Sequence, residues 1–472
     1  MTLPEEFVKY TKELMGDERF ETLMEGLKAE PPVSIRLNPM KCDIANTAIS
    51  GKRKDVAWCP TGMYLDGRPN FTFDPLLHAG TYYVQEAASM FVAHVLRQTV
   101  SHGVTMLDLC AAPGGKSTVC RTFLPEGSLL IANEPIRTRA NVLSENMQKF
   151  GHPDVIVTNN YPRDFRKSGL MFDVILADVP CSGEGMFRKD VDAIAGWSVQ
   201  NVENCRRLQR EIVGDIWSCL KPGGLMIYST CTFNAHENEE NAAWIAGELG
   251  ADFVEIAVSP EWHVTGALAG SNPSYRFLPG TSEGEGLFMT VLRKHGDAAT
   301  PVRTAGVRKR NRKSAMPVSL PLVGSDGFET REKGDTVVAV PKRWADVYDS
   351  IVSCLNVMHA GVTIGTRKGK DIVPDQSLAL SALLDRSRFA CVDLDYAQAI
   401  GYLRKETVAV PDGTPKGFVL FTYKDTPIGF GKNIGNRVNN LYPQEWKIKS
   451  RHIPEQKEFI HPKIRNYHPI HD

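Results

Sequence analysis

From residue 104 to residue 230 the chain alternates short apolar runs with segments of helical composition, and this alternation limits the possible folds more than any other feature. The apolar runs occupy residues 104–110, 127–134, 154–160, 172–180 and 225–230. Strands that are apolar along most of their length and separated by helices form a parallel sheet that is covered on both faces. Ligands of such sheets bind beyond the carboxyl ends of the strands. The residues that follow these five runs are therefore the candidates for a functional site.

Bulk composition places the chain among intracellular globular proteins. Its 472 residues exceed one ordinary core, and its 42% hydrophobic and 23% charged residues are typical of soluble domains. The charged N-terminus lacks the apolar core of an export signal. The ten cysteines contain no CxxC pair, which argues against a metal cluster and against a disulfide framework and predicts a reducing cytoplasm. A net charge of zero neither suggests nor excludes nucleic acid as a partner.

Composition shifts divide the chain into four parts. Residues 1–100 form an N-terminal region with a helical start, and residues 101–295 contain the strand–helix alternation. Residues 296–340 are predicted to be a basic linker, and residues 341–472 a C-terminal region that ends in β-type alternation with glycine turns. The linker includes "VRKRNRK" at 307–313, for which a solvated flexible segment and a nucleic-acid contact are both open interpretations.

A turn of small residues follows the first apolar run, in "LDLCAAPGGKST". Backbone amides can approach a ligand closely there, because little or no side chain is present at Ala111, Ala112, Gly114 and Gly115. The dinucleotide pattern GxGxxG is absent, and the P-loop pattern fails because Cys110 stands where its first glycine is required. An S-adenosylmethionine site expects an acidic residue after the second strand, and Glu134 is present there. An NTPase stays a minor alternative.

Two later runs lead into cysteines. Cys181 follows Asp178 in "ADVPCSGEG", and Cys231 follows the run 225–230. Carbon 5 of a pyrimidine is a poor nucleophile, and a thiolate that adds at carbon 6 activates it, which is ordinary covalent catalysis. The residues alone do not decide which thiol would attack. Other cysteines are interpreted as small buried hydrophobic residues: Cys205, Cys219 and Cys391.

Five motifs together carry a resemblance: "SIRLNP", "QEAASM", "LDLCAAPGGKST", "ADVPCSGEGMFRK" and "YSTCTFNAHENEEN". In this order they resemble the NOL1/NOP2/Sun family of RNA cytosine-5 methyltransferases, most of all its bacterial RsmF-like branch, which modifies small-subunit (16S) ribosomal RNA. The resemblance covers residues 30–295 and implies a class I (Rossmann-like) α/β core. That core has a mostly parallel seven-stranded sheet whose antiparallel strand is "GLFMTVLRK", at 286–294. The resemblance makes residues 101–295 the catalytic region and residues 1–100 a family-specific, RNA-binding α+β region. More loosely, it implies a C-terminal RNA-binding region with a PUA-like end.

The resemblance assigns roles to individual residues. It makes Cys231 the nucleophile and Cys181 the thiol that helps to release the product, with Asp178 at the junction of cofactor and target base. Glu134 would hold the ribose of S-adenosyl-L-methionine. The turn that would cradle the methionine part consists of Cys110, Ala111, Ala112, Pro113, Gly114, Gly115 and Lys116.

One segment departs from the family pattern. The family commonly has an aspartate near the adenine after the third strand, whereas this chain has Asn159, Asn160 and Tyr161. We expect the carbonyl oxygen of Asn160 to accept the same hydrogen bond. The resemblance also predicts that Arg188 or Lys189 lies near substrate phosphate.

Two alternatives stay open outside the proposed centre. His236 either acts near the nucleophile or is a surface residue at a helix start. Arg36 and Asn38 either contact RNA or brace two domains.

The sequence thus predicts a cytoplasmic, S-adenosylmethionine-dependent enzyme that methylates carbon 5 of a cytosine, with 16S ribosomal RNA as the expected substrate. The partner is RNA, with neither DNA nor a membrane expected. The target base must leave its stack to reach Cys231. The alternatives are a tRNA methyltransferase and a non-catalytic RNA-binding or ribosome assembly factor.

Overall fold

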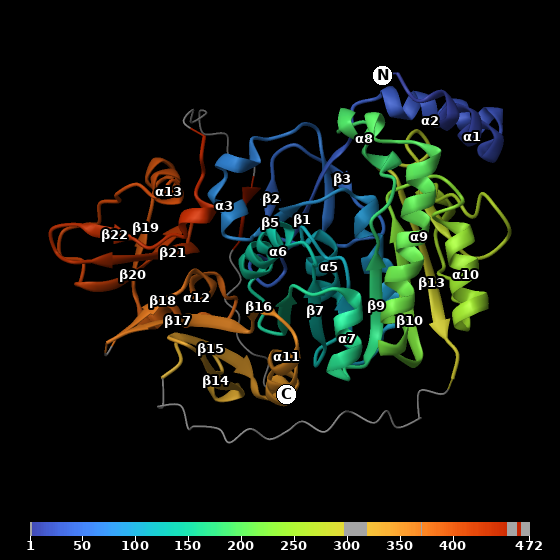
Figure 1. Ribbon diagram of the computed structural model, residues 1–472. Coiled ribbons are helices and arrows are strands. Elements are labelled where there is room, and N and C mark those ends of the chain that lie inside the picture. The colour runs from blue at the N-terminus through green and yellow to red at the C-terminus, as the bar shows by residue number, and fades with distance from the viewer. Residues whose placement is uncertain (1, 297–318, 370, 451–459, 464–472) are drawn as a thin grey trace.

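The computed structural model describes residues 2–296, 319–369, 371–450 and 460–463. In the view of Figure 1, the N-terminal sheet lies above a large central sheet, and two smaller C-terminal sheets lie to its left. Within the described residues, no helix combines the length and the apolar character that crossing a membrane requires.

The N-terminal region has the α+β character that the sequence predicts. Its elements are α1 (Glu5–Met15), α2 (Asp17–Lys28), β1 (Val33–Leu37), β2 (Ala48–Ile49), β3 (Lys52–Asp55), β4 (Gly62–Leu65), α3 (Pro75–His78), β5 (Tyr82–Val84) and α4 (Val92–Thr99). Four of the strands form an antiparallel sheet in the order β3-β4-β1-β5. Phe7 of α1 packs against Phe187 and Trp197, which follow the sheet strand β9. Helices α1 and α2 therefore cover a loop at the carboxyl edge of the central sheet.

The central sheet contains nine strands in the order β11-β13-β10-β9-β6-β7-β8-β16, with β12 beside β13. They are β6 (Thr105–Asp108), β7 (Leu129–Asn133), β8 (Val155–Thr158), β9 (Phe172–Asp178), β10 (Leu220–Thr230), β11 (Ala251–Phe253), β12 (Tyr275–Phe277), β13 (Leu287–Lys294) and β16 (Val357–Ala360). Strands β6 to β10 are parallel, so all five apolar runs form the predicted sheet. The predicted antiparallel strand is β13, which pairs with β10. The short strands β12 and β16 extend the predicted seven strands to nine.

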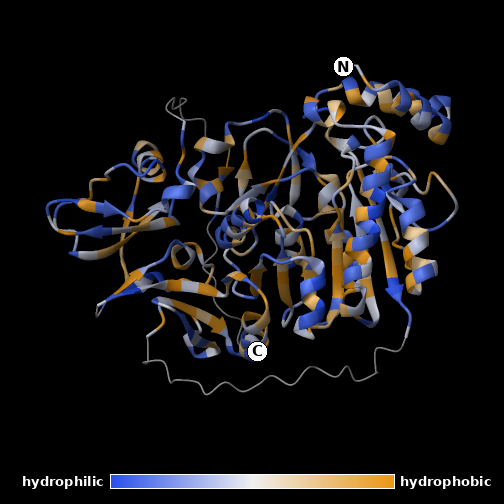
Figure 2. Cartoon of the chain, viewed as in Figure 1, coloured by the Kyte–Doolittle hydropathy of each residue, from blue (hydrophilic) through white to orange (hydrophobic). Residues whose placement is uncertain are grey.

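Helices cover both faces of this sheet. They are α4 with α5 (Gly115–Phe123) and α6 (Arg137–Phe150) on one face, and α7 (Pro162–Ser168), α9 (Val199–Ile216) and α10 (Glu239–Leu249) on the other, with the short α8 (Val191–Ala195) beyond β9. Successive residues of a strand enter opposite cores: Met106 packs with the first set of helices and Leu107 with the second. Burial on both faces explains why these strands are apolar throughout, as the orange central strands of Figure 2 show.

Two polar residues tie the N-terminal sheet to the catalytic region. Arg36 is fully buried and donates hydrogen bonds to Gln85 and to the hydroxyl groups of Thr118 and Thr122 in α5. The amide of Asn38 donates to the carbonyl oxygens of Gly80 and Phe150, at 3.0 and 2.9 Å. Of the two interpretations of Arg36 and Asn38, the structure shows the brace.

The C-terminal region contains two four-stranded sheets. The first consists of β14 (Phe328–Lys333), β15 (Thr336–Pro341), β17 (Val362–Lys368) and β18 (Asp371–Pro374), with α11 (Ala345–Cys354) and α12 (Gln376–Leu380). The second consists of β19 (Ala390–Asp393), β20 (Gly417–Tyr423), β21 (Thr426–Asn433) and β22 (Val438–Asn440), with α13 (Tyr396–Leu403). A last short strand, β23 (Ile460–His461), pairs with β2.

The predicted linker differs from the structure in its second half. Residues 328–341 form the hairpin β14–β15, in which Val337 and Val340 are buried. A hairpin of six-residue strands needs only one turn signal, which Gly334 supplies at φ +60°, and the basic residues that precede it obscured this pattern. The basic run 307–313 lies outside the described residues.

The C-terminal region also completes the catalytic sheet. Strand β16 pairs antiparallel with β8, with Val357 opposite Thr158 and Ala360 opposite Ile156. Ile351 of α11 is fully buried in the second core. The first C-terminal sheet is thus built onto the catalytic region.

Candidate active site

The small-residue turn lies at the carboxyl end of β6, between α6 and the N-terminal strand β5. Gly114 has φ +113°, and a Cβ atom there would lie 3.3 Å from Leu143. A Cβ atom on Gly115 would lie 3.4 Å from the ring of Tyr83. The carbonyl of Pro113, which follows a cis peptide bond, accepts a hydrogen bond from Asn146 at 2.8 Å. The turn therefore requires glycine and is held in place from both sides.

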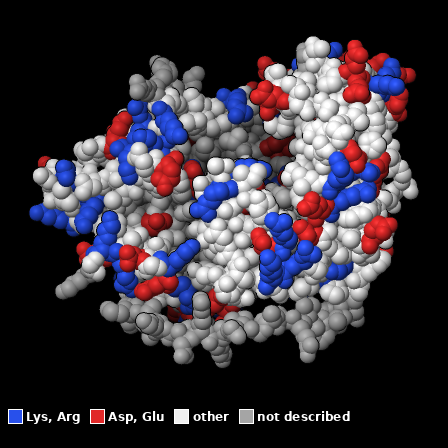
Figure 3. All heavy atoms as spheres, in the orientation of Figure 1, with Lys and Arg blue, Asp and Glu red and all other residues white. Residues whose placement is uncertain are grey.

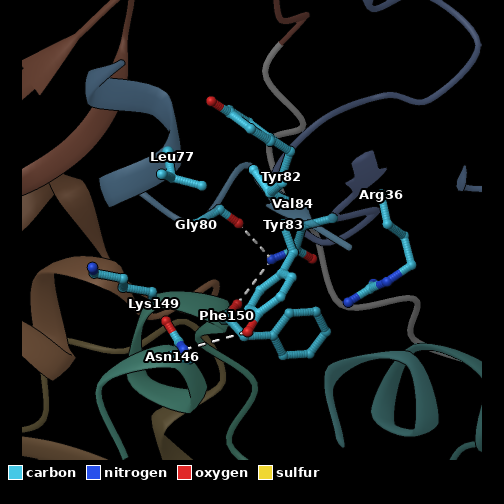
Figure 4. Close-up of a pocket in the computed structure, with 10 residues that line it drawn as sticks. Arg36, Leu77, Gly80, Tyr82, Tyr83, Val84, Asn146, Lys149 and Phe150 are labelled. Carbon is cyan, nitrogen blue, oxygen red and sulfur yellow. Dashed lines mark hydrogen bonds between the residues drawn. The ribbon is translucent and has the colours of Figure 1, made fainter. Parts of the chain in front are cut away.

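A cavity of about 240 Å³ lies behind this turn, between the N-terminal sheet and α6. Figure 4 shows Tyr83 and Asn146 pointing toward one another in it, with a hydrogen bond of 3.4 Å. Asn38 donates hydrogen bonds to the carbonyl oxygens of Gly80 and Phe150 on opposite sides of the cavity. Arg36 and Asn38 line this cavity, whereas none of the residues predicted for catalysis or cofactor binding does, so it is adjacent to the candidate site and not part of it.

Glu134 follows β7 and is 1% exposed. Its Oε1 accepts a hydrogen bond from the N–H of Ile136 at 3.0 Å, whereas its buried Oε2 has no hydrogen-bond partner among the described residues. The nearest cation is Arg139, 3.6 Å away. A buried carboxylate oxygen without a donor is costly, and a ligand hydroxyl would satisfy it. Together with the narrow turn, this buried acceptor fits the ribose and methionine parts of S-adenosylmethionine.

The loop after β8 does not present Asn160 as expected. Its side-chain oxygen accepts the N–H of Asn356 at 3.1 Å, and its side-chain amide faces the carbonyl of Asn356 at 3.4 Å. The amide of Asn159 donates to the carbonyls of Glu134 and Pro135, at 2.8 and 2.9 Å. Asn160 is thus engaged by the C-terminal region, and its contact with adenine stays a prediction.

Asp178 ends β9 and connects the turn to β10. It accepts hydrogen bonds from Lys116 Nζ and from Ser229 Oγ, both at 2.9 Å. Burial lowers the pKa of Lys116, but the adjacent Asp178 carboxylate outweighs this effect and raises that pKa overall. The neighbouring Asp108 bonds Ser117 at 2.6 Å, and burial raises the pKa of Asp108 to about 7. Lys116 is therefore held as a cation at the mouth of the turn.

The two predicted thiols lie side by side. Strands β9 and β10 pair with Asp178 opposite Ser229, so the loops that follow them run together. The Sγ atoms of Cys181 and Cys231 are 3.1 Å apart, and both cysteines are free. The hydrogen bond with Cys231 and burial raise the pKa of Cys181 well above its usual value. The structure thus brings together the thiols, Asp178 and the turn, as the sequence predicted.

The remaining cysteines lie elsewhere. Cys219 is buried as predicted, Cys205 is half-buried, and Cys391 is exposed, so the prediction of burial was wrong for Cys391. Cys391 lies in β19, whose alternate residues face solvent. A single apolar residue type does not reveal which face of an edge strand it occupies.

Sequence reasoning missed a buried polar network beneath the thiols. Glu237 accepts hydrogen bonds from the N–H of Ser182 and from the amides of Gln209 and Asn234, at 3.0, 2.6 and 2.9 Å. Glu184 accepts from Trp197 and from the N–H of Asn234, at 2.9 and 3.0 Å. Ser182 and Thr232, the residues after the two cysteines, are hydrogen-bonded at 2.9 Å. The only sequence signal for this network was the presence of acidic residues, Glu184 in "SGEG" and Glu237 in "NAHENEEN".

Three other predicted residues take structural positions. His236 pairs with Glu240 at 2.7 Å and stacks on Tyr10, which supports its interpretation as a surface residue. Arg188 is buried against Glu285 and the carbonyl of Gly26, at 3.1 Å each, and so braces the N-terminal helices. Lys189 is more exposed and also pairs with Glu285.

Three family models match the chain. They are 16S rRNA methyltransferase RsmB/F at residues 96–293, the N-terminal domain of 16S rRNA methyltransferase RsmF at 3–87, and the methyltransferase RsmF PUA domain at 389–448.

Curated relatives are similar along nearly the whole length. Ribosomal RNA small subunit methyltransferase F of Photobacterium profundum is 27% identical over 94% of this chain and 97% of its own. The protein of the same name from Aliivibrio fischeri is 29% identical over the same shares.

Among solved structures, NSun6 from Pyrococcus horikoshii matches with a TM-score of 0.52 and 21% identity, over 62% of this chain and 99% of that one. A methyltransferase homolog from the same organism matches with a TM-score of 0.53 and 23% identity, over 62% and 95%. These structures share the fold of the catalytic region.

Proposed function

Because this chain belongs to the RsmB/F family of 16S rRNA methyltransferases, we propose that it methylates carbon 5 of a cytosine in 16S ribosomal RNA. S-adenosyl-L-methionine, when bound, supplies a methyl group activated by a positively charged sulfur. The observation that carries the choice of carbon 5 is the pair of thiols 3.1 Å apart beside Asp178. Methylation of a nitrogen or oxygen atom needs no covalent activation, whereas carbon 5 does.

The chain's own residues supply the covalent steps. The thiolate of Cys231 forms a bond from Sγ to carbon 6 of the cytosine, which moves an electron pair onto carbon 5 and makes that carbon nucleophilic. After methylation a base removes the proton from carbon 5, the Sγ–C6 bond breaks, and its electron pair returns to Cys231. The thiol of Cys181, 3.1 Å from Cys231, donates a hydrogen bond to the departing thiolate. Asp178 accepts hydrogen bonds from Lys116 and Ser229, and we expect it to lie beside the ring of the target base.

Cofactor binding rests on the turn 110–116 and on Glu134. We expect Glu134→Ala to weaken binding of S-adenosylhomocysteine about 10- to 100-fold, since hydrogen bonds to a charged group contribute about 1.5–3 kcal/mol each. Isothermal titration calorimetry measures this, with the exposed Glu126→Ala as the matched control. An unchanged Kd in Glu134→Ala would remove Glu134 from the site.

Several observations support RNA as the substrate and the cytoplasm as the compartment. The match to the RsmF PUA domain at 389–448 supports RNA binding, and the relatives are named for the small ribosomal subunit. Figure 3 shows Lys and Arg over the C-terminal region and over α7 and α9, with acidic groups between them. The ten free cysteines fit a reducing compartment.

The proposed function is tested with methyl-labelled S-adenosylmethionine and unmodified small-subunit RNA, free and assembled in subunits, with tRNA in parallel. We expect one 5-methylcytosine in 16S RNA, identified by mass spectrometry of nuclease fragments. Label in tRNA alone, or in none of the three, would overturn the proposed substrate.

A further inference from the structure

The two thiols of the site are chemically equal, yet the proposed reaction needs them to differ. When two ionisable groups are in contact, the pair loses its first proton with an apparent pKa that belongs to the pair and not to either group. The negative charge that results can lie on either of the two. With Cys181 and Cys231 3.1 Å apart, something outside the pair must decide which sulfur carries the negative charge. Charged groups lie on both sides of the pair and differ in sign.

Glu237 lies on the Cys181 side. It is fully buried, and its Oε2 accepts the N–H of Ser182, the residue after Cys181, at 3.0 Å. The groups named above that contact the carboxylate of Glu237 are all hydrogen-bond donors, as an ionised carboxylate requires. Among the described residues Glu237 makes no ion pair, and its charge therefore reaches the thiols without a neutralising partner. It contributes, after the hydrogen bond that Cys181 donates to Cys231 and after burial, to the raised pKa of Cys181.

Glu237 carries this charge above its own pKa. Burial raises the pKa of Glu237 itself to about 7, with the acidic Glu184 adding to the rise, while the hydrogen bond from Ser182 lowers it. Tyr228 donates its hydroxyl to the backbone carbonyl of Glu237 at 2.6 Å. Cys205 also has its pKa raised, by burial first and then by Glu237.

Lys116 lies on the other side. Its ammonium group bonds Asp178, whose partner Ser229 lies two residues before Cys231. Cys231 is among the groups that raise the pKa of Lys116, after burial, which lowers it, and Asp178. Lys116, held by Asp178, thus lies on the Cys231 side, and Glu237, which is ionised above its pKa of about 7, lies on the Cys181 side.

We propose that Lys116 and Glu237 polarise the thiol pair, placing its negative charge on Cys231 and keeping Cys181 protonated. Glu237 is then a positioning residue that acts through Ser182 and Cys181, without touching substrate. The consequence for catalysis rests on the proposed function, but the polarisation itself needs neither RNA nor cofactor. It gives a physical reason for the roles of the two cysteines, which the residues alone left open.

The test alkylates the free protein with limiting iodoacetamide at about pH 8, above the pKa of Glu237, and measures the share of label at each cysteine by peptide mass spectrometry. In the wild type we expect label on Cys231 in preference to Cys181. Glu237→Gln keeps the shape and removes the charge, so the ratio of label on Cys181 to label on Cys231 should rise, by up to about tenfold for each pH unit by which the pKa of Cys181 falls. Glu237→Asp keeps the charge and should retain the wild-type preference.

Two controls keep the test decisive. Glu240→Gln changes an exposed carboxylate one turn away and should label like the wild type. Lys116→Gln tests the other side and should reduce the label at Cys231, even if Glu237→Gln fails to fold. Unchanged labelling in a folded Glu237→Gln, or a Cys231 label that survives Lys116→Gln, would overturn the proposal. RNA methylation by the same wild-type preparation tests the proposed function separately, because a preparation with polarised thiols can still lack that activity.

Discussion

Cys181→Ala is expected to arrest the protein as a covalent complex with its RNA, whereas Cys231→Ala should form neither a complex nor 5-methylcytosine. The Sγ atom of Cys181 lies 3.1 Å from that of Cys231 and can donate a hydrogen bond to it. Without this bond the departure of Cys231 from carbon 6 is not assisted, and the adduct accumulates. Without Cys231 the first bond cannot form, and activity should fall by at least about 10³-fold, as loss of a nucleophile does. Incubation with RNA and labelled S-adenosylmethionine, followed by a denaturing gel, measures both.

Cys205→Ala is the matched control, because this half-buried thiol lies on α9 outside the pair. It should behave like the wild type. An adduct that appears only in Cys231→Ala would exchange the roles of the two cysteines and would also contradict the proposed polarisation. Methylation that survives in Cys231→Ala would exclude covalent catalysis by this thiol.

The second large effect concerns the interface between the N-terminal region and the catalytic region. Gly80→Ala should lower the free energy of unfolding by about 3 kcal/mol, from about 1–2 kcal/mol of left-handed strain and a further 1–3 kcal/mol of overpacking. Gly80 has φ +72°, and a Cβ atom there would overlap the carbonyl oxygen of Lys149 at the end of α6. Urea unfolding followed by circular dichroism measures the change.

Gly51→Ala separates the two contributions. Gly51 has nearly the same φ, +71°, but no atom lies within 4 Å of its added Cβ. Gly51→Ala should therefore lower the free energy of unfolding by the strain contribution alone. Equal decreases in the free energy of unfolding of the two variants would contradict this prediction. They would mean that α6 moves away from the added Cβ atom at no measurable cost.

The sequence predicted the parts of the fold that depend on local pattern. Strands β6 to β10 were predictable because burial on both faces makes them apolar throughout, and the placement of Cys181 and Cys231 followed from two parallel strands ending together. Strand β16 was not predictable, since its four residues form a strand only through pairing with β8.

The same reason explains the misses at the site. Glu237 looks like a surface residue in an acidic stretch, and it is buried because Ser182 and Gln209, distant in sequence, supply its donors. Asn160 follows a strand in the position of a ligand contact, but Asn356 reaches it from the C-terminal region. The local sequence around a residue does not indicate which distant residues will contact it.

The pairing of β16 with β8 also sets an order of events during synthesis. Val357 leaves the ribosome about 200 residues after Thr158, which at about 5–20 residues per second takes about 10–40 s. Through that interval the nascent catalytic sheet has an open edge, whose unpaired N–H and C=O groups can template pairing with another chain. The catalytic sheet of this protein is therefore closed late in translation, by a strand from the region that carries the PUA domain.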